Sequence, residues 1–164
     1  IKKDVRNGVW NIGYVKDVRD SKSVTIRITL STLEHVALSG SGEISSTNTF
    51  KGINELNMAM AGLGKINLDY EATKSEVSLS GSGAVELKGS SHIFAINMTG
   101  SGEVSAAELK SDICEIHISG SGDATVHVND QLSSFISGSG DVQYSGTPTV
   151  NAKISGSGEV SKMN

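Results

Sequence analysis

Seven pairs of glycines recur along the chain, and each pair is separated by a single residue. The middle residue is serine in six of the seven pairs. Successive first glycines are 22, 19, 19, 20, 18 and 18 residues apart. The pairs are Gly40 and Gly42, Gly62 and Gly64, Gly81 and Gly83, Gly100 and Gly102, Gly120 and Gly122, Gly138 and Gly140, and Gly156 and Gly158. A fixed period of about 20 residues indicates a solenoid, in which each repeat stacks only on its neighbours.

Apolar residues keep the same distance from every glycine pair. Two residues before the first glycine stand Leu38, Met60, Leu79, Met98, Ile118, Ile136 and Ile154. Four residues after it stand Ile44, Ile66, Val85, Val104, Ala124, Val142 and Val160. The positions between these are mostly serine, threonine or charged residues. Alternation with a period of two predicts strands with one buried face and one face in water.

A repeat of this length is too short for a strand pair with a helix, but it suits one coil of a β-helix. We therefore predict an all-β fold: a right-handed single-stranded parallel β-helix of about seven coils, each of 18–22 residues. The paired glycines fall on the inward parity, where the backbone bends and approaches its neighbour, so they are structural corner residues. The alternative is an antiparallel meander in which each Gly-Ser-Gly is a hairpin turn. The constant register of the apolar columns favours parallel coils, because only those place equivalent residues over one another.

Residues 1–35 lack the glycine pair, whereas the coils occupy residues 36–164. Residues 9–12 resemble a short strand, residues 20–23 a turn, and the alternating Val24, Ile26, Ile28 and Leu30 a second strand. We expect one domain, 1–164, in which this segment caps the first coil and Trp10 packs there. The chain stops four residues after Val160. Because an uncovered coil exposes strand edges, we expect either a homodimer through that end or a longer chain.

The composition excludes several classes of protein. The formal net charge is −4 and no dense stripe of lysine or arginine occurs, which excludes a nucleic-acid-binding surface. No apolar run approaches the roughly 18 residues that cross a bilayer, so we expect no transmembrane segment. Cys114 is the only cysteine and has no internal disulfide partner. The chain opens on Ile1 rather than Met, so the absence of a signal peptide is uninformative.

Catalytic motifs are also missing from the sequence. It contains no nucleophile elbow, phosphate loop or zinc-ligand spacing. β-Helix enzymes that cleave acidic polysaccharides need arginine, lysine and aspartate clustered on one face. Here the three arginines, Arg6, Arg19 and Arg27, all precede the repeats. We therefore expect a protein that is not an enzyme and needs no cofactor.

Two outward columns are candidates for binding. Glu103, Asp123, Asp141 and Glu159 would stack about 5 Å apart, either as a solvated column or as a set of calcium ligands. The serines beside and between the glycines would form hydroxyl ladders, which could contact a glycan or another surface. They could equally be small residues that tolerate the corner.

The remaining candidates are isolated side chains. His35 and His117 point outward while His92 and His127 stand at unrelated offsets, so we expect no histidine metal site. The positions equivalent to Cys114 are mostly apolar, which predicts a buried thiol. Phe135 has outward parity beside an inward Ser134, and we expect a local irregularity there.

The run Leu33–Ile44, followed by the recurring Ser-Gly-Ser-Gly-Asp/Glu-Val, resembles the family called putative auto-transporter adhesin, head GIN domain. The resemblance covers roughly residues 22–160. It implies a bacterial cell-envelope domain with a right-handed β-helix-like fold that is secreted or attached to the surface and is not an enzyme. The second repeat departs from the pattern, because Leu63 and Lys65 replace the serine and the acid.

We therefore predict a structural or adhesive binding module of the cell envelope or the extracellular space. Its partner would be a surface glycan or a protein. Two alternatives remain open at this stage: a calcium-stabilised form of the same module, and a β-helix protein that binds or acts on polysaccharides.

Overall fold

The computed structural model describes residues 2–6, 8–13 and 24–163, and the chain divides into two compact units, residues 1–30 and 31–164. In the first unit, β1 (Lys2–Arg6) pairs with β2 (Val9–Gly13) in antiparallel register. The strand predicted at residues 9–12 is therefore confirmed. Trp10 on this strand is 49% exposed.

The second strand predicted for this unit was wrong. Residues 24–30 form no strand, and their four alternating apolar side chains are exposed. Alternation makes a strand only where a partner edge supplies backbone hydrogen bonds, and no strand pairs with this segment in the part of the chain that the structure describes. The predicted turn at residues 20–23 lies outside the described residues. The capping role of residues 1–35 stays a prediction.

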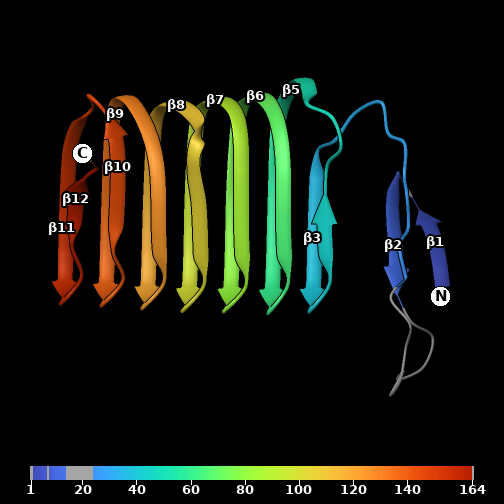
Figure 1. The fold of residues 1–164 in the computed structure, drawn as a ribbon, viewed down its shortest axis with the longest axis horizontal. Helices are drawn as coiled ribbons and strands as arrows, with labels where there is room; N and C mark the ends of the chain where they lie inside the picture. The colour runs from blue at the N-terminus through green and yellow to red at the C-terminus, as the bar shows by residue number, and fades with distance from the viewer. Residues whose placement is uncertain (1, 7, 14–23, 164) are drawn as a thin grey trace. The chain divides into compact units, whose positions relative to one another are not determined.

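The second unit is a parallel β-solenoid of about seven turns (Figure 1). All of the strand pairs described in it are parallel, so the antiparallel meander was wrong. Its described strands are β3 (His35–Gly40), β4 (Glu43–Ser45), β5 (Phe50–Gly62), β6 (Lys65–Gly81), β7 (Ala84–Gly100), β8 (Glu103–Gly120), β9 (Asp123–Gly138), β10 (Val142–Gly146), β11 (Thr149–Gly156) and β12 (Val160–Lys162).

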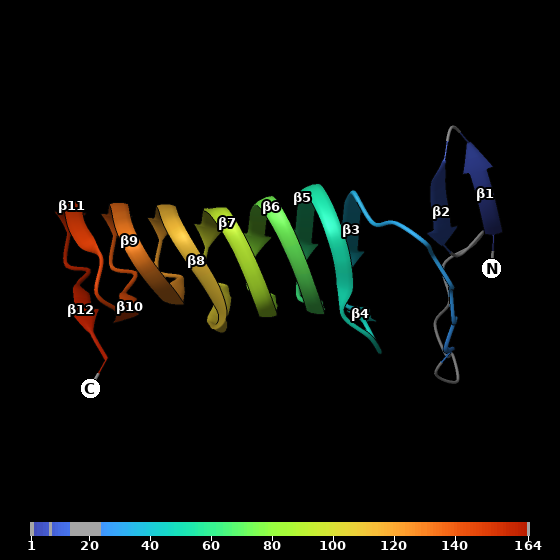
Figure 2. The same cartoon turned by 90° about the horizontal axis from the view of Figure 1, so that it is seen from above.

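The coils wind in the right-handed sense. In Figure 1 the N-terminal coils lie on the right and the C-terminal coils on the left, and β10 ascends. Figure 2 shows the same cartoon from above. There β4, β10 and β12 lie on the side that faces the viewer of Figure 1, and β3 and β11 lie on the opposite side. The chain thus ascends in front, descends behind and moves leftward. Each coil consists of an ascending limb, a wide return and a descending limb that ends at a glycine pair.

The register follows the glycine alignment residue for residue. Gly40 pairs with Gly62, Gly62 with Gly81, and each later first glycine with the next, up to Gly138 with Gly156. Where the register shifts, it shifts away from the corner, for example between Ala106 and Lys110. Repeats of 18–22 residues therefore share one corner geometry, and the variation in length is absorbed on the opposite side of the coil.

The glycine corner brings neighbouring backbones into direct contact. Gly100 has a φ of 114°, and a Cβ there would lie 2.5 Å from the carbonyl oxygen of Gly81. The second glycine faces the core, and a Cβ on Gly102 would lie 2.6 Å from a Leu79 methyl group. Inter-coil hydrogen bonds continue through the corner, since Ser101 N donates to Gly81 O at 3.0 Å. The first glycine is therefore required by its positive φ and by a neighbouring carbonyl. The second is required by core packing and also by a neighbouring carbonyl, since a Cβ on Gly102 would lie 2.8 Å from Gly83 O.

The core is a stack of apolar columns inside the coils. The columns two before and four after the first glycine are buried in the central coils, as predicted. Its largest fully buried side chains are Tyr70, Phe94, Leu56, Ile66, Leu79, Leu87, Ile96, Met98, Leu109, Ile116, Leu132 and Val77. Burying apolar surface at about 25 cal/mol per Å² provides the main stabilisation of such a stack.

The wide end of the coil also contains buried polar groups. Tyr70 Oη donates to Ser75 Oγ at 2.9 Å, and Ser75 Oγ donates to Ser91 Oγ at 2.8 Å. Burial raises the pKa of the Tyr70 hydroxyl well above its usual value, so this group stays protonated. Ser134 differs, because its buried Oγ has no hydrogen-bond partner among the described residues.

The C-terminal coil leaves part of its inner surface uncovered. Val150 and Ile154 on β11 are 37% and 40% exposed, whereas their register partners Leu132 and Ile136 on β9 are buried. A homodimer formed through this surface stays a prediction.

The positive φ of the corner glycine and its close approach to a neighbouring backbone can be tested separately. Gly100→Ala is expected to lower the free energy of unfolding by more than about 2 kcal/mol. The φ at this position is unfavourable for alanine, and the added methyl group would clash with Gly81 O of the preceding coil. Gly40→Ala is the control, since Gly40 has a φ of 99° but would meet nothing within 4 Å. Urea unfolding followed by circular dichroism gives both values, and equal losses would contradict the close-approach argument.

A second test concerns which side chains of each strand point inward and which point outward. Ile118→Asp is expected to cost more than about 4 kcal/mol, because it places a carboxylate without a partner in the apolar core. Asp123→Asn should be nearly silent, because Asp123 is exposed and its Oδ1 accepts a hydrogen bond from Asp141 N that an amide oxygen can also accept. Thermal melting of both variants checks this, and similar melting temperatures would show that the faces are assigned wrongly.

Ser134 offers a stabilising substitution. Ser134→Ala is expected to raise the free energy of unfolding by about 1 kcal/mol, because it removes a buried hydroxyl without a partner. Ser75→Ala is expected to lower it by a similar amount, because Ser75 is equally buried but fully hydrogen-bonded. A loss of stability in Ser134→Ala would mean that its hydroxyl has a partner in solution.

Candidate binding face

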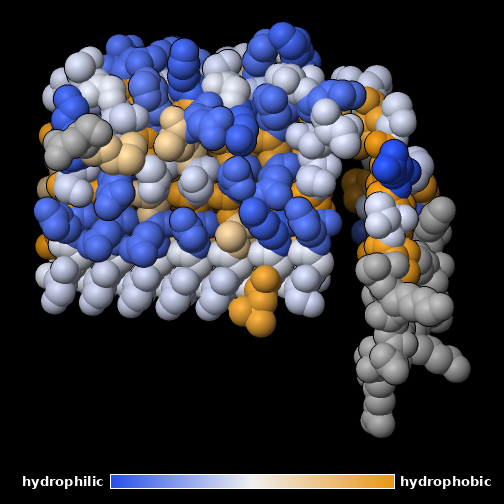
Figure 3. Space-filling view, in the orientation of Figure 1, coloured by the Kyte–Doolittle hydropathy of each residue, from blue (hydrophilic) through white to orange (hydrophobic). Residues whose placement is uncertain are grey.

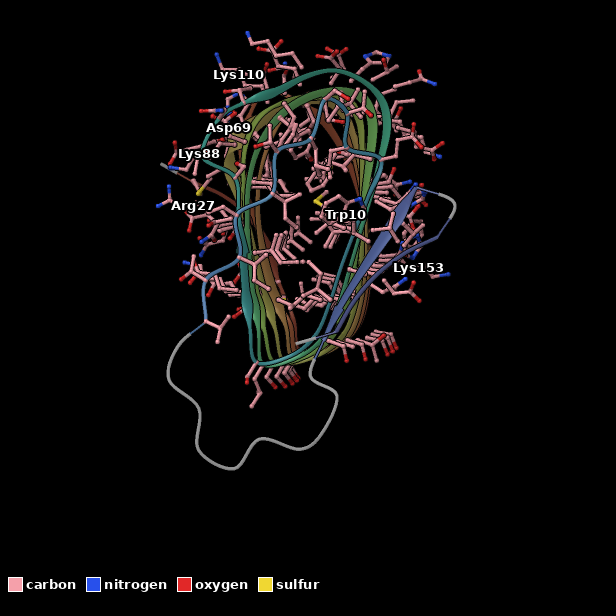
Figure 4. All side chains as sticks on the ribbon, turned by 90° about the vertical axis from the view of Figure 1, so that its right-hand side faces the viewer. Trp10, Arg27, Asp69, Lys88, Lys110 and Lys153 are labelled. Atoms are coloured by element: carbon pink, nitrogen blue, oxygen red, sulfur yellow. The ribbon has the colours of Figure 1, made fainter. Side chains whose placement is uncertain are left out.

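Outward side chains form two opposite faces on the solenoid. We call the outer side of the limbs that end at the glycines the descending face, and the outer side of the limbs that follow them the ascending face. In Figure 4, Lys153 of the descending face lies on one side of the coil, and Asp69 and Lys88 of the ascending face lie on the other. Because the coils are in register, each face is a set of straight columns of equivalent residues.

The descending face carries the exposed large hydrophobic residues of the central coils. Ile93, Ile113 and Phe135 are 37%, 36% and 36% exposed at outward positions of β7, β8 and β9. On the ascending face, no described large hydrophobic residue is exposed to this degree. It carries ion pairs instead, such as Lys88 with Glu108 at 3.1 Å and Lys65 with Glu86 at 3.2 Å. Exposed apolar side chains gathered on one face favour contact with another surface.

Two rings stack at the centre of the descending face. The His117 and Phe135 ring centroids are 4.8 Å apart and their planes differ by 8°. The two residues are register partners on β8 and β9, so the spacing of the coils produces the stack. Glu115 Oε1 lies 2.9 Å from His117 Nε2 and orients the imidazole. We call His117 and Phe135 the aromatic pair.

The irregularity predicted at Phe135 was wrong. The ladder from Glu115 to Gly120 pairs with residues 133–138 without a register shift. Phe135 keeps its outward parity because the ring finds a stacking partner outside the coil, while Ser134 beside it is fully buried. The sequence signal for the pair was the column three residues before each first glycine, which contains Asn97, His117, Phe135 and Lys153 in successive coils.

A shallow, open groove runs along this column. Side chains of the column form one wall, and the column of small hydroxyl residues nearer the corner forms the floor. The lining residues are Asn97, Met98, Thr99, His117, Ile118, Ser119, Phe135, Ile136, Ser137, Lys153 and Ser155. Within the part of the chain that the structure describes, Lys153 forms no ion pair. The hydroxyls of the floor form no hydrogen bond to another described residue. The groove therefore offers donors that the fold itself leaves unused.

The serines of the corner are exposed, as expected from the alternation. In Figure 3 they belong to the pale edge below the blue charged band of the solenoid. Leu63 replaces serine in the second coil and is 72% exposed, so the row of corner hydroxyls is interrupted there.

The acidic column has a structural role in the last coils. Asp141 N donates to Asp123 Oδ1 at 2.9 Å, and Glu159 N donates to Asp141 Oδ1 at 2.9 Å. A short aspartate side chain thus accepts a backbone N–H of the next coil. Among the described residues, no group of three or more histidine, cysteine, aspartate or glutamate side chains could hold a metal ion. The observations therefore give no support to the calcium alternative for Glu103, Asp123, Asp141 and Glu159.

His92 and His127 lie at separate places on the solenoid. His92 Nδ1 is 2.8 Å from Asp112 Oδ2, and this hydrogen bond, with a second one from Asn129, lowers the pKa of the Asp112 carboxyl. His127 Nδ1 is 2.8 Å from Ser145 Oγ. Each of these histidines therefore bonds to a nearby side chain.

Cys114 is fully buried, as predicted, and burial raises the pKa of its thiol well above the usual value. A buried, protonated thiol is a poor nucleophile, and Cys114 acts as a small apolar core residue.

Solved structures with the same fold come from Bacteroides and Parabacteroides species. A putative adhesin from Bacteroides fragilis is 25% identical, with a TM-score of 0.88 over 99% of this chain and 76% of that chain. A putative lipid binding protein from Parabacteroides distasonis is 32% identical, with a TM-score of 0.77 over 79% of this chain and 53% of that chain. This chain thus spans about half the length of the latter. A putative adhesin from Parabacteroides merdae, 23% identical over 80% of this chain and 64% of that chain with a TM-score of 0.59, shares the fold.

No curated protein matches the chain. No helix occurs in the part of the chain that the structure describes, so none is found there that could cross a membrane. The family model described as "Putative auto-transporter adhesin, head GIN domain" matches residues 1–148, which includes the first unit and all but the last coil. The chain therefore belongs to the family described as putative auto-transporter adhesin, head GIN domain.

Proposed function

We propose that this protein is a non-enzymatic binding module of the bacterial cell envelope or surface, and that it adheres through its descending face. The observation that carries the proposal is the gathering of Ile93, Ile113 and Phe135 on that face, opposite a face held by ion pairs. Family membership and the similarity to a solved structure described as a putative adhesin support the adhesive role and the envelope location.

The shape of the site favours an extended partner. The groove is shallow and open, and the columns beside it continue over several coils. A small substrate is normally held in a concave pocket that buries most of its surface, and the descending face has no such pocket among the described residues. A flat face with repeated rows suits a polymer or another surface, and the residues on it include no paired nucleophile and base.

Adhesion can be measured with a panel of immobilised surfaces. The panel contains peptidoglycan sacculi, purified capsular polysaccharides, phospholipid vesicles and extracellular-matrix proteins. Ile93→Ser/Ile113→Ser/Phe135→Ser is expected to reduce retention on the surface that wild type binds by at least about tenfold, since three apolar anchors are lost. Serine replaces outward side chains only, so we expect the fold to persist, and circular dichroism checks this.

A matched triple variant of the ascending face serves as the control. Lys65→Ser/Glu86→Ser/Lys88→Ser removes one interacting charge cluster from exposed positions. It should leave retention within about twofold of wild type, because surface ion pairs contribute little to the fold and this face makes no contact. Equal losses in both triple variants, or loss in the control alone, would overturn the assignment of the descending face.

A further inference from the structure

We propose that the groove beside the aromatic pair binds a glycan chain that carries carboxylate groups, with Lys153 as the ionic anchor. This inference rests on the proposed function and adds the chemical class of its ligand. Four observations lead to it: the free ammonium of Lys153, the row of unused hydroxyls, the exposed aromatic ring and the fully paired backbone beneath them.

The backbone of this face excludes recognition by strand addition. Strands β7, β8 and β9 are paired on both sides, so their N–H and C=O groups are used within the ladder. A peptide that adds a strand needs a free sheet edge, which the middle of a face lacks. A ligand in the groove is therefore recognised by side chains.

The polar side chains of the groove include one ammonium donor and a row of hydroxyls that can donate or accept hydrogen bonds. Lys153 is the register partner of Phe135, which places an ammonium group on the coil next to the ring. Hydroxyls of Thr99, Ser119, Ser137 and Ser155 follow one another at the coil spacing along the floor. Unpaired ammonium and hydroxyl donors are suited to a ligand rich in carboxylate and hydroxyl oxygens.

The aromatic pair supplies the apolar part of the site. One face of the Phe135 ring is covered by His117, and the side chain remains 36% exposed. A sugar ring presents a patch of C–H groups that packs on aromatic carbon, while its hydroxyls stay free for hydrogen bonds. Four coils spaced about 4.8 Å apart give the floor a length of roughly 14 Å. A glycan chain advances per sugar by a distance similar to the spacing of the coils, so a short run of sugars would meet successive hydroxyls.

The probes are a tetrasaccharide of α-1,4-linked galacturonic acid and its methyl ester, which keeps the rings and removes the charge. Isothermal titration calorimetry should give measurable binding of the acid form and at least about tenfold weaker binding of the ester, the scale of one charge-assisted hydrogen bond. Amide chemical shifts should change at the groove residues and remain constant on the ascending face.

Two variants, each with a matched control, locate the site. Lys153→Ser and Phe135→Ser should each weaken binding about tenfold. Serine is tolerated in this column, since Ser78 occupies it in the third coil. Lys110→Ser removes an exposed lysine elsewhere, and Leu63→Ser removes an exposed apolar side chain at the corner, where the other coils have serine. Both controls should bind within about twofold of wild type.

Several outcomes would overturn the inference. Absence of binding by the acid tetrasaccharide, equal affinity for acid and ester, or insensitivity to Lys153→Ser would each do so. Binding to phosphatidylglycerol vesicles that depends on Lys153, without binding of the tetrasaccharide, would assign the groove to a lipid surface instead. If the tetrasaccharide fails while the panel still shows retention through the descending face, the glycan inference falls and the proposed function stands.

Discussion

The close approach of backbones at the glycine corner is the constraint on which the rest of the structure depends. At this corner one strand ends at the first glycine and the next strand begins three or four residues later. The carbonyl oxygen of one coil lies close to where a Cβ of the next coil would be. Only glycine satisfies both the positive φ and the contact. Because every coil meets this requirement at the same place, equivalent residues fall into straight columns. The apolar columns then form a continuous core, and the outward columns form faces that a partner can contact.

Most of the solenoid could be predicted because its repeat carries the information several times over. The glycine pairs fix the register, and the columns two before and four after them fix the inner face; both agree with the observed pairing of Met98 with Ile118 and Val85 with Val104. The return could not be predicted in detail, because its length varies from coil to coil and register shifts there leave no common signal. Residues 24–30 show the opposite case, in which alternation without a partner edge produces no strand.

The candidate site was visible only in part for a related reason. Cys114 was correctly predicted as a buried thiol, because its equivalents in other coils are mostly apolar. Phe135 seemed anomalous in its own repeat, since a large ring at an outward position has no role within one coil. Its role appears between coils, where the 4.8 Å stack with His117 forms. A residue that acts across the stack must be compared with its neighbours in the column, and no property of a single repeat identifies it. The same holds for the aspartates that accept a backbone N–H of the next coil.

Footprinting with hydroxyl radicals shows whether the descending face makes the contact. The protein is oxidised free and while adsorbed on the surface that retains it best, and side-chain oxidation is read by mass spectrometry. We expect strong protection of Phe135 and Ile113 on adsorption. Leu63 at the corner, which is 72% exposed, should remain as reactive as in free protein. Protection of Leu63 with unchanged oxidation of Phe135 and Ile113 would contradict the account, because the contact would then lie on the corner edge.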